Sequence, residues 1–371
     1  MARKRLSPTM VVIAAASLAC ALVLLGVLLY WSPGKPRAFV DEKGKPLAGS
    51  ITEKIRIPIN GVEQGMFLKG RDKANPVLLF LHGGPGMPEY FLDRTHPTGL
   101  EDDFVVCWWE QRGSGLSYSS DIVPDSMTVE QLIADAIAVA DYLRERFGKN
   151  KIYLMGHSWG SFLGIQVAER APELFHAYVG IGQVSYQLRS ERLSYEYELE
   201  RFRKSGNTRM VRKLEEAPVT MLAPLPESYR ALRDKAMHSL GVGTTRDMKS
   251  VISGVFLPVW RTREYTVTEK IDVGRGKSFS QGLLWDTFLN TDLTAQVSEL
   301  DIPVYICHGE HDHTVSYVLA KAYFDELKAP VKGFYSFEQS AHSPAFEEPE
   351  RMRQILREDV TTGENRLADG I

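Results

Sequence analysis

Short apolar runs alternate with amphipathic stretches along most of this chain, and this alternation restricts the fold more than any other feature. A run such as Val77–Leu81 has no polar position, which is typical of a strand buried on both faces. Between such runs, apolar residues recur at the three-to-four spacing of a helix, as in Thr128–Phe147. This order predicts an α/β fold, in which helices cover both faces of a mostly parallel sheet. The expected strands are 51–59, 62–69, 77–81, 104–109, 152–155, 175–181, 303–307 and 331–337, and the expected helices are 128–147, 158–170, 315–327 and 346–358.

The alternation stops between residues 184 and 293. This stretch is polar and helical in pattern, and it has no run suited to a buried strand. A segment of about 110 residues is too long for a loop inside a compact domain. We therefore expect a helical cap at 184–293, inserted into a core formed by 51–183 and 294–371. Within that core, Asn60-Gly61 between the first two strands predicts a hairpin.

Residues 10–31 form an uncharged, almost wholly apolar run near the start of the chain. At about 1.5 Å per helical residue, the run spans a hydrocarbon core of about 30 Å. Arg3, Lys4 and Arg5 precede it, so the positive-inside rule predicts a cytoplasmic N-terminus at residues 1–9. A linker rich in Pro and Gly follows at 32–50. These features favour a single-pass signal anchor in the cell membrane, with the folded domain on the outer side.

Two processed forms are the alternatives to an anchor. A cleaved signal peptide usually has an apolar region of about 7–15 residues that ends in small residues. Ser17-Leu18-Ala19-Cys20 has some features of a lipoprotein processing site. The apolar run is longer than that of a signal peptide and continues past Cys20, which favours the uncleaved segment.

Charge and composition narrow the class of function. The chain has 44 Lys and Arg against 47 Asp and Glu, a formal net charge of -3. A basic surface that would hold nucleic acid is therefore not expected. Its three cysteines cannot form a disulfide framework, and no pair has zinc-ligand spacing. No phosphate-binding or dinucleotide-binding glycine motif appears in the right context, so neither a cofactor nor a metal is expected.

The motif Gly156-His157-Ser158-Trp159-Gly160 lies between an expected strand and an expected helix, which is the context of a nucleophile elbow. Such a turn projects a serine hydroxyl into a cleft, and its two glycines leave room for the neighbouring strand and helix. The sequence therefore predicts Ser158 as a nucleophile. The alternative is a glycine-rich turn whose serine only caps the helix. His157 is expected to have a structural role.

A second glycine-rich turn, His82-Gly83-Gly84-Pro85-Gly86, directly follows the run Val77–Leu81. A turn at this position can present a backbone N–H to the oxyanion that forms when a serine attacks a carbonyl. We expect the N–H groups of Gly84 and Trp159 to form this oxyanion hole. The alternative is an ordinary tight turn after a strand.

An acid and a base are expected downstream of the serine, because this elbow is followed along the chain by Asp or Glu and then by His. Asp312 follows the strand at 303–307, and His342 follows the strand at 331–337. Ser158 would attack, His342 would accept its proton, and Asp312 would hold the imidazole. A metal site in the Asp312 loop is the alternative, but the other polar residues of this loop do not have zinc-ligand spacing. These residues are His308, Glu310, His311 and His313.

Three motifs together resemble the proline iminopeptidase (prolyl aminopeptidase) branch of the α/β hydrolases. They are His82–Gly86, the stretch Trp109–Ser117, and Gly156–Ser161, and the similarity covers about 77–182 and 301–350. The resemblance implies a triad of Ser158, Asp312 and His342 that releases an N-terminal residue from short peptides. It also implies that Gln111–Ser117 supports the floor of the site.

The chain departs from that family in two ways. Glu110 stands where the family usually has Asp. The cap also lacks the Trp-x-x-Trp-Glu motif whose glutamate helps the family to hold the free amine of the substrate. Six cap glutamates are candidates for that task, and nothing in the sequence selects one. They are Glu196, Glu198, Glu200, Glu215, Glu216 and Glu227.

The sequence thus predicts a membrane-anchored serine hydrolase that acts on a small molecule or a short peptide. An esterase, lactonase, amidase or C–C hydrolase of the same fold is the alternative that the missing cap motif favours. A binding module that has lost catalysis is a third hypothesis, which a complete triad disfavours.

Overall fold

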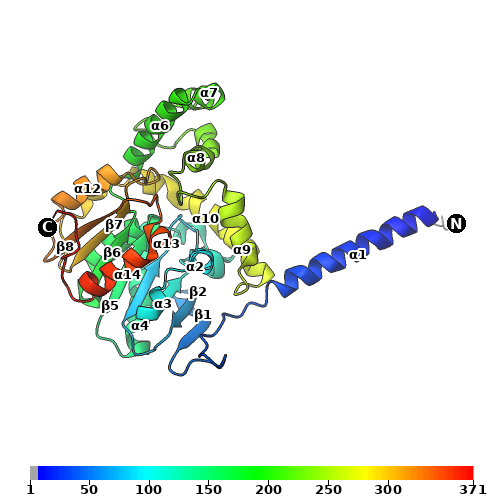
Figure 1. Cartoon of the computed structure of the whole chain (residues 1–371), viewed down its shortest axis with the longest axis horizontal. Helices are drawn as coiled ribbons and strands as arrows, with labels where there is room; N and C mark the ends of the chain where they lie inside the picture. The colour runs from blue at the N-terminus through cyan, green and yellow to red at the C-terminus, as the bar shows by residue number, and fades with distance from the viewer. Residues whose placement is uncertain (1–6, 371) are drawn as a thin grey trace.

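The computed structural model describes residues 7–370, and most of them form an eight-stranded sheet with helices on both faces (Figure 1). The strand order is β1-β2-β4-β3-β5-β6-β7-β8. β1, β2 and β4 pair antiparallel, and all the other neighbours are parallel, as the strand–helix alternation predicts. The strands are β1 Ile51–Ile59, β2 Val62–Gly70, β3 Val77–Leu81, β4 Val105–Trp109, β5 Ile152–His157, β6 Phe175–Ile181, β7 Val304–Gly309 and β8 Lys332–Phe337.

Alternate side chains of each central strand enter two different apolar layers. In β3, Leu79 and Leu81 pack toward α4 and α5, whereas Leu78 and Phe80 pack toward α2, α3 and α14. Helices that belong to the core are α2 Tyr90–Thr95, α3 Leu100–Asp103, α4 Val129–Phe147, α5 Trp159–Arg170, α12 Tyr317–Glu326, α13 Pro344–Glu347 and α14 Pro349–Ile355. Short helical turns lie at η1 Gly115–Ser117, η2 Pro124–Ser126, η3 Pro172–Leu174 and η5 Leu356–Val360.

The last helix differs from the expectation of one continuous helix at 346–358. It is divided into α13, α14 and the wider turn η5. Pro349 explains the first break, because a residue that precedes proline is sterically pushed out of the helical region. Glu348 accordingly has φ −127° and ψ 60°.

Residues between β6 and β7 form helices, of which α6, α7 and α8 stand above the core in Figure 1. The side chains of α6 to α8 enclose a small apolar cluster of their own, which includes Leu214 and Tyr229. The long helix α10 joins this cluster to the core, since Phe288 contacts Trp159 while Leu289 faces the cluster. The helices are α6 Gln187–Lys204, α7 Thr208–Glu215, α8 Glu227–Leu240, η4 Ile252–Phe256, α9 Leu257–Arg261, α10 Val267–Asn290 and α11 Leu293–Gln296.

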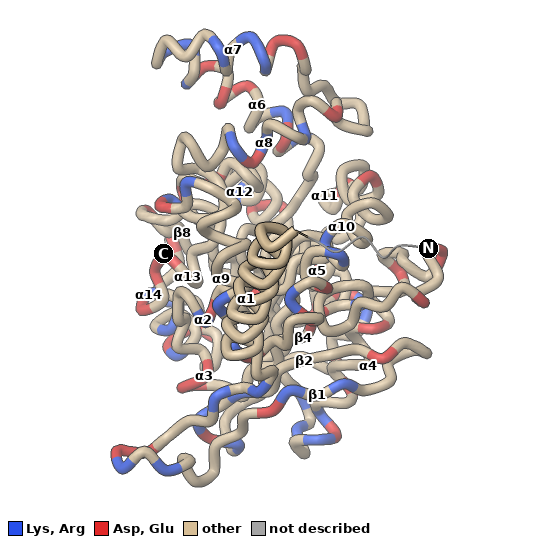
Figure 2. The backbone as a smooth tube through the Cα atoms, turned by 90° about the vertical axis from the view of Figure 1, so that its right-hand side faces the viewer, with Lys and Arg blue, Asp and Glu red and all other residues tan. Residues whose placement is uncertain are grey.

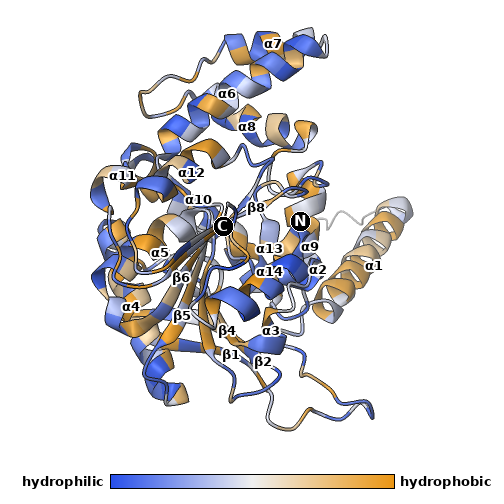
Figure 3. Ribbon diagram, turned by 60° about the vertical axis from the view of Figure 1, so that its left-hand side comes forward, coloured by the Kyte–Doolittle hydropathy of each residue, from blue (hydrophilic) through white to orange (hydrophobic). Residues whose placement is uncertain are grey.

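The N-terminal helix α1, Pro8–Tyr30, projects away from the rest of the molecule (Figure 1). It has 23 residues and a mean hydropathy of 2.8, and none of them is buried. In the view of Figure 3, most of its residues are hydrophobic. The helix is long and apolar enough to cross a membrane, a property that signal sequences share. Arg3, Lys4 and Arg5 lie outside the described residues.

Candidate active site

Ser158 lies on a sharp turn between β5 and α5. Its φ of 57° and ψ of −121° are unusual for a residue with a side chain. The two motif glycines make this turn possible. A Cβ at Gly156 would lie 2.2 Å from the carbonyl oxygen of Gly160, and one at Gly160 would lie 1.9 Å from that of Leu81. The local sequence thus holds Ser158 at the point where β5 ends and the N-terminus of α5 begins.

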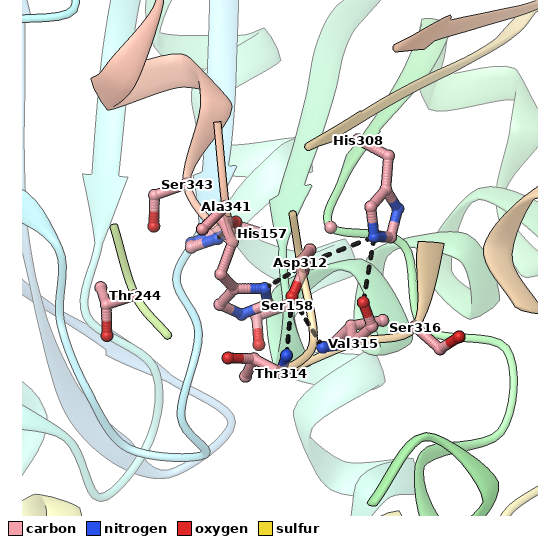
Figure 4. Close-up of polar contacts among 12 residues, drawn as sticks. His157, Ser158, Thr244, His308, Asp312, Thr314, Val315, Ser316, Ala341 and Ser343 are labelled. Carbon is pink, nitrogen blue, oxygen red and sulfur yellow. Dashed lines mark hydrogen bonds and ion pairs between the residues drawn. The ribbon is translucent and has the colours of Figure 1, made fainter. Parts of the chain in front are cut away.

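The predicted acid and base are hydrogen-bonded to each other. His342 Nδ1 lies 2.8 Å from Asp312 Oδ2, and since a carboxylate only accepts, Nδ1 carries the proton. Asp312 Oδ1 accepts hydrogen bonds from the backbone N–H groups of Thr314, at 2.8 Å, and Val315, at 2.9 Å (Figure 4). These contacts hold the carboxylate in one orientation and leave Nε2 of His342 as the unprotonated nitrogen.

His308 is a second partner of Asp312, and nothing in the sequence distinguishes it from its neighbours in this role. Its Nε2 lies 3.1 Å from Asp312 Oδ2 and 3.2 Å from the carbonyl oxygen of Val315 (Figure 4). Burial by itself would raise the pKa of Asp312, but His342 and His308 together lower it well below its ordinary value. The carboxylate therefore stays ionised. Of the remaining loop residues, Glu310 is exposed and the His313 ring stacks on Tyr197.

Burial lowers the pKa of His342 below its ordinary value of 6.5, although Asp312 acts in the opposite direction. The base form therefore persists to mildly acidic pH. We expect kcat/KM to stay constant from neutral pH downward and to decline only below pH 6.5, where His342 becomes protonated. A pH–rate profile measures this, and an acid limb centred above pH 6.5 would contradict it.

The predicted oxyanion donors lie beside the serine. A Cβ at Gly83 would be 3.3 Å from Ser158 Cβ, which places the glycine-rich turn against the nucleophile. Gly84 has a φ of 123°, which a residue with a side chain rarely adopts. Throughout residues 7–370, no intramolecular hydrogen bond uses the backbone N–H of Gly84 or of Trp159. Both groups are thus available to an oxyanion.

Gln111 forms hydrogen bonds with both the His82–Gly86 turn and the turn at Ser158. Its side-chain amide donates to the carbonyl of His82 at 2.9 Å, and its oxygen accepts from the Trp159 indole at 2.9 Å. Neighbouring Glu110 accepts from Tyr265, which lies between α9 and α10, and from the backbone N–H of Leu116 at 2.6 Å. Burial raises the pKa of Glu110 to about 7. These contacts agree with a supporting role for the stretch after β4.

One cavity contains the predicted nucleophile, the base and the glycine-rich turn. It is lined by Ser158, His342, Gly83 and Gly84 from the core, and by side chains of α8, η4 and α10. Asp312 lies behind His342. None of the six candidate cap glutamates lines it, and five of them are exposed on the helices. Glu198 is the exception, since it is fully buried and burial raises its pKa to about 8.

Two carboxylates do line the cavity, namely Glu89 and Asp234. Glu89 lies just before α2, three residues after the His82–Gly86 turn, and its Oε1 accepts from the N–H of Gly83 at 3.0 Å. The same oxygen is 2.8 Å from Nδ1 of His157. Its other oxygen, Oε2, is buried and has no hydrogen-bond partner among residues 7–370. Glu89 was not among the residues predicted from the sequence, where its only signal is an acidic side chain close behind the glycine-rich turn.

Glu89 also connects the loops that carry the site. His157 Nε2 lies 2.8 Å from the backbone oxygen of His342, so this nitrogen donates. Burial opposes the charged form of His157, but Glu89 outweighs it and the pKa of His157 is raised. His157 therefore links Glu89 to the His342 loop, and the structural role predicted for it is visible in these two contacts.

Comparison with known proteins places this geometry in a family. Residues 76–349 match the family model of the alpha/beta hydrolase fold. The chain belongs to this family. It is therefore an α/β hydrolase, with the fold that the resemblance implied.

Individual relatives of this hydrolase are aminopeptidase-like. It is 35% identical to the probable aminopeptidase YbaC of Bacillus subtilis, over 84% of this chain and 97% of the relative. It is 24% identical to a proline iminopeptidase of Lactobacillus helveticus, over 82% and 96% of the two chains. Among solved structures, a proline iminopeptidase-related protein of Thermus thermophilus aligns with a TM-score of 0.57 and 20% identity, covering 83% of this chain and 98% of that one.

Proposed function

We propose that this hydrolase is a membrane-anchored serine aminopeptidase that releases the N-terminal residue of short peptides. The observation that carries the proposal is that Glu89 lines the cavity that contains Ser158 and His342 and keeps one buried carboxylate oxygen without a hydrogen-bond partner. A carboxylate at this place suits a substrate with a free α-ammonium group next to the scissile carbonyl. The similarity to YbaC over nearly its whole length supports the same function.

In the proposed mechanism, His342 accepts the proton of Ser158 as the serine oxygen attacks the carbonyl carbon. The oxyanion forms hydrogen bonds with the N–H groups of Gly84 and Trp159. His342 then donates its proton to the leaving amine, and the acyl-enzyme remains. Water, deprotonated by His342, hydrolyses the ester and restores Ser158. Asp312 keeps the proton of His342 on Nδ1 throughout and stabilises the imidazolium.

Glu89 is the proposed anchor for the substrate amine. A methyl group at Gly83 would lie 2.8 Å from Glu89 Oε1 and 3.3 Å from Ser158 Cβ, so little more than one methyl group separates the carboxylate from the serine. An α-amine is two bonds away from the carbonyl carbon that Ser158 attacks. The closeness of Glu89 to Ser158 therefore suits a substrate whose free α-amine lies next to the scissile carbonyl.

The helical region at 184–293 is proposed as the lid over a core of 51–183 and 294–371. It contributes Gln187, Asp234 and Trp285 to the cavity walls. For α1, we propose an uncleaved signal anchor with residues 1–9 in the cytoplasm. The length of α1 and the absence of buried residues in it support this assignment, under which the active site lies on the outer side of the cell membrane.

The test of this function is a comparison of initial rates for the full-length protein in detergent. The substrates are the 4-nitroanilides of L-proline and L-alanine, their N-acetylated forms, and 4-nitrophenyl acetate. We expect turnover of the free-amine anilides and little turnover of the acetylated ones. Equal rates on both anilide forms, or turnover of the ester alone, would replace the aminopeptidase assignment with an amidase or esterase.

Replacing Glu89 by glutamine tests the proposed anchor with little change in shape. Glutamine keeps an oxygen to accept from Gly83, but puts an NH2 group where Oε2 would receive the ammonium. A hydrogen bond to a charged group contributes about 1.5–3 kcal/mol, so we expect kcat/KM for free-amine anilides to fall by about 10- to 100-fold. Activity toward 4-nitrophenyl acetate should fall much less.

The matched control for Glu89→Gln is Asp234→Asn, which removes the other carboxylate of the cavity. The Asp234 side chain is 50% exposed, and its charge is screened by water. We expect at most a small loss with this variant. If both variants lose the same activity, or if Glu89→Gln loses ester and anilide turnover equally, Glu89 does not select the amine.

A further inference from the structure

A short apolar segment of the lid is exposed beside the end of α1. This segment, residues 251–261, comprises Val251, η4 and α9, and we call it the interfacial segment. Its exposed side chains include Ile252, Phe256 and Leu257, whose exposed fractions are 67%, 54% and 38%. Single exposed apolar residues are ordinary, but three close together on one short segment mark a contact surface.

The opposite side of the interfacial segment faces inward. Val251 and Val255 line the cavity that contains Ser158, and Val259 is buried against the core. The segment is therefore a wall of the active site on one side and an exposed apolar surface on the other.

Three contacts connect the interfacial segment to the carboxyl end of α1. The ammonium of Lys270 donates to the backbone oxygen of Trp31 at 2.7 Å, to Ser32 Oγ at 2.9 Å and to the backbone oxygen of Trp260 at 2.8 Å. Lys270 is 3% exposed, so this junction is shielded from water. One buried lysine thus holds the end of the interfacial segment against the end of the helix.

Residues after α9 strengthen the same junction. The guanidinium of Arg263 lies 4.8 Å from the centre of the Tyr30 ring. The backbone oxygen of Arg263 accepts a hydrogen bond from the N–H of Gly34 at 3.0 Å. In Figure 1, α9 runs across the direction of α1 next to its base. Figure 2 looks toward that base and shows α9 and α10 on the two sides of α1. The interfacial segment therefore lies across the helix axis, as a segment in the plane of a membrane would.

Basic side chains border the apolar surface. Arg37, Arg261 and Arg263 line a groove together with Arg94 and Glu264. Glu264 pairs with Arg94 at 3.5 Å, which leaves the other three arginines as an excess of positive charge. Apolar side chains next to arginines suit a bilayer surface with anionic headgroups, where the former enter the acyl boundary and the latter bind phosphates.

We infer that the interfacial segment inserts into the surface of the bilayer that α1 crosses, so that one wall of the active-site cavity rests on the membrane. The inference rests on the proposed membrane-spanning role of α1. The inference goes further than that role, because a spanning helix on a flexible linker would let the catalytic domain rotate relative to the membrane. The contacts of Lys270 and Arg263 fix the domain to α1, so that the interfacial segment faces the lipid.

Depth-sensitive quenching tests this orientation in the full-length protein. Cys107 and Cys307 are buried and burial raises their thiol pKa values, so a single added cysteine can be labelled once Cys20 is replaced by serine. A fluorophore is attached at Phe256→Cys or Ile252→Cys, and the proteins are placed in vesicles of phosphatidylcholine and phosphatidylglycerol. Phosphatidylcholine with a doxyl group high on its acyl chain is the quencher for positions 252, 256 and 318, and phosphatidylcholine with the doxyl group near the chain end is the quencher for Cys20.

The matched control is Val318→Cys, because Val318 is as exposed as Ile252, at 69%, and lies on α12. The native Cys20, in the middle of α1, reports on the anchor itself when it is labelled without other changes. We expect quenching at positions 20, 256 and 252 and none at 318.

Quenching at Cys20 without quenching at 256 or 252 would overturn the orientation and leave the anchor intact. No quenching at Cys20 would overturn the anchor as well. A blue shift at 256 that appears in detergent and grows with protein concentration, without quenching by lipid, would show that a second copy of the chain covers the surface, and would also overturn the inference. Retained turnover of the anilides in each labelled protein shows that it is folded.

Discussion

Replacing Ser158 by alanine is expected to lower kcat by a factor on the order of 10⁴–10⁶ while the protein stays folded. In the proposed mechanism the serine oxygen forms the acyl-enzyme bond, so its removal takes away the nucleophile. Initial rates on the substrate that the wild-type protein prefers, together with labelling by a fluorophosphonate probe, measure the effect. We expect the wild type to be labelled at Ser158 and the variant to remain unlabelled.

A glycine at the same position separates chemistry from folding. Ser158 has a positive φ that costs a residue with a side chain on the order of 1–3 kcal/mol, and glycine removes this strain. Ser158→Gly is thus expected to be as inactive as Ser158→Ala but more stable to heat. An active Ser158→Ala variant would refute the serine mechanism, and a Ser158→Gly variant less stable than the alanine variant would refute the strain argument.

Asp312→Asn is expected to lower kcat by about 10⁴-fold, because it imposes the wrong imidazole tautomer. The oxygen of the asparagine is held by the N–H groups of Thr314 and Val315, so its NH2 group faces His342. Nδ1 of His342 must then accept, and its proton moves to Nε2, which can no longer take a proton from Ser158. If the substitution only shifted the pKa of His342, the variant would recover wild-type kcat at a pH where the imidazole is neutral. We expect kcat to stay low there, because the neutral imidazole is in the wrong tautomer.

A matched control for this variant lies just before β7, the strand that leads to Asp312. Asp301→Asn removes one carboxylate from an exposed position and should leave kcat unchanged. Thermal unfolding of both variants separates a loss of activity from a loss of structure. If Asp312→Asn retained more than about a tenth of wild-type kcat, another residue would have to orient His342.

The catalytic residues could be predicted from the sequence because the motifs that mark them are local or follow a fixed order along the chain. The strand, the two glycines and the helix around Ser158 lie within a few positions of one another, and their steric reasons act at that range. Asp312 and His342 each follow a buried strand, and parallel strands place their carboxyl ends at one edge of the sheet. The contact between these two side chains could therefore be expected from the sequence.

The carboxylate that lines the cavity beside Ser158 could not be predicted from the sequence in this way. Six cap glutamates were equivalent in the sequence, yet Glu198 is buried and the others are exposed, and none of them lines the cavity. Glu89 was overlooked because its role depends on the fold of α2 against two other loops. Its partners Gly83 and His157 lie 6 and 68 residues away along the chain.

By itself, the sequence determined the parallel sheet, the turn at Ser158, the order of acid and base, and a helix long enough to cross a membrane. These depend on hydrophobic periodicity and backbone sterics, which act over a few residues. Only the tertiary structure decided that Glu89 lines the cavity and keeps one oxygen unpaired, that His308 shares Asp312, and that Lys270 joins α9 to the end of α1. Such pairings arise between distant residues, and the packing of the whole core decides which polar atoms meet and which remain without a partner.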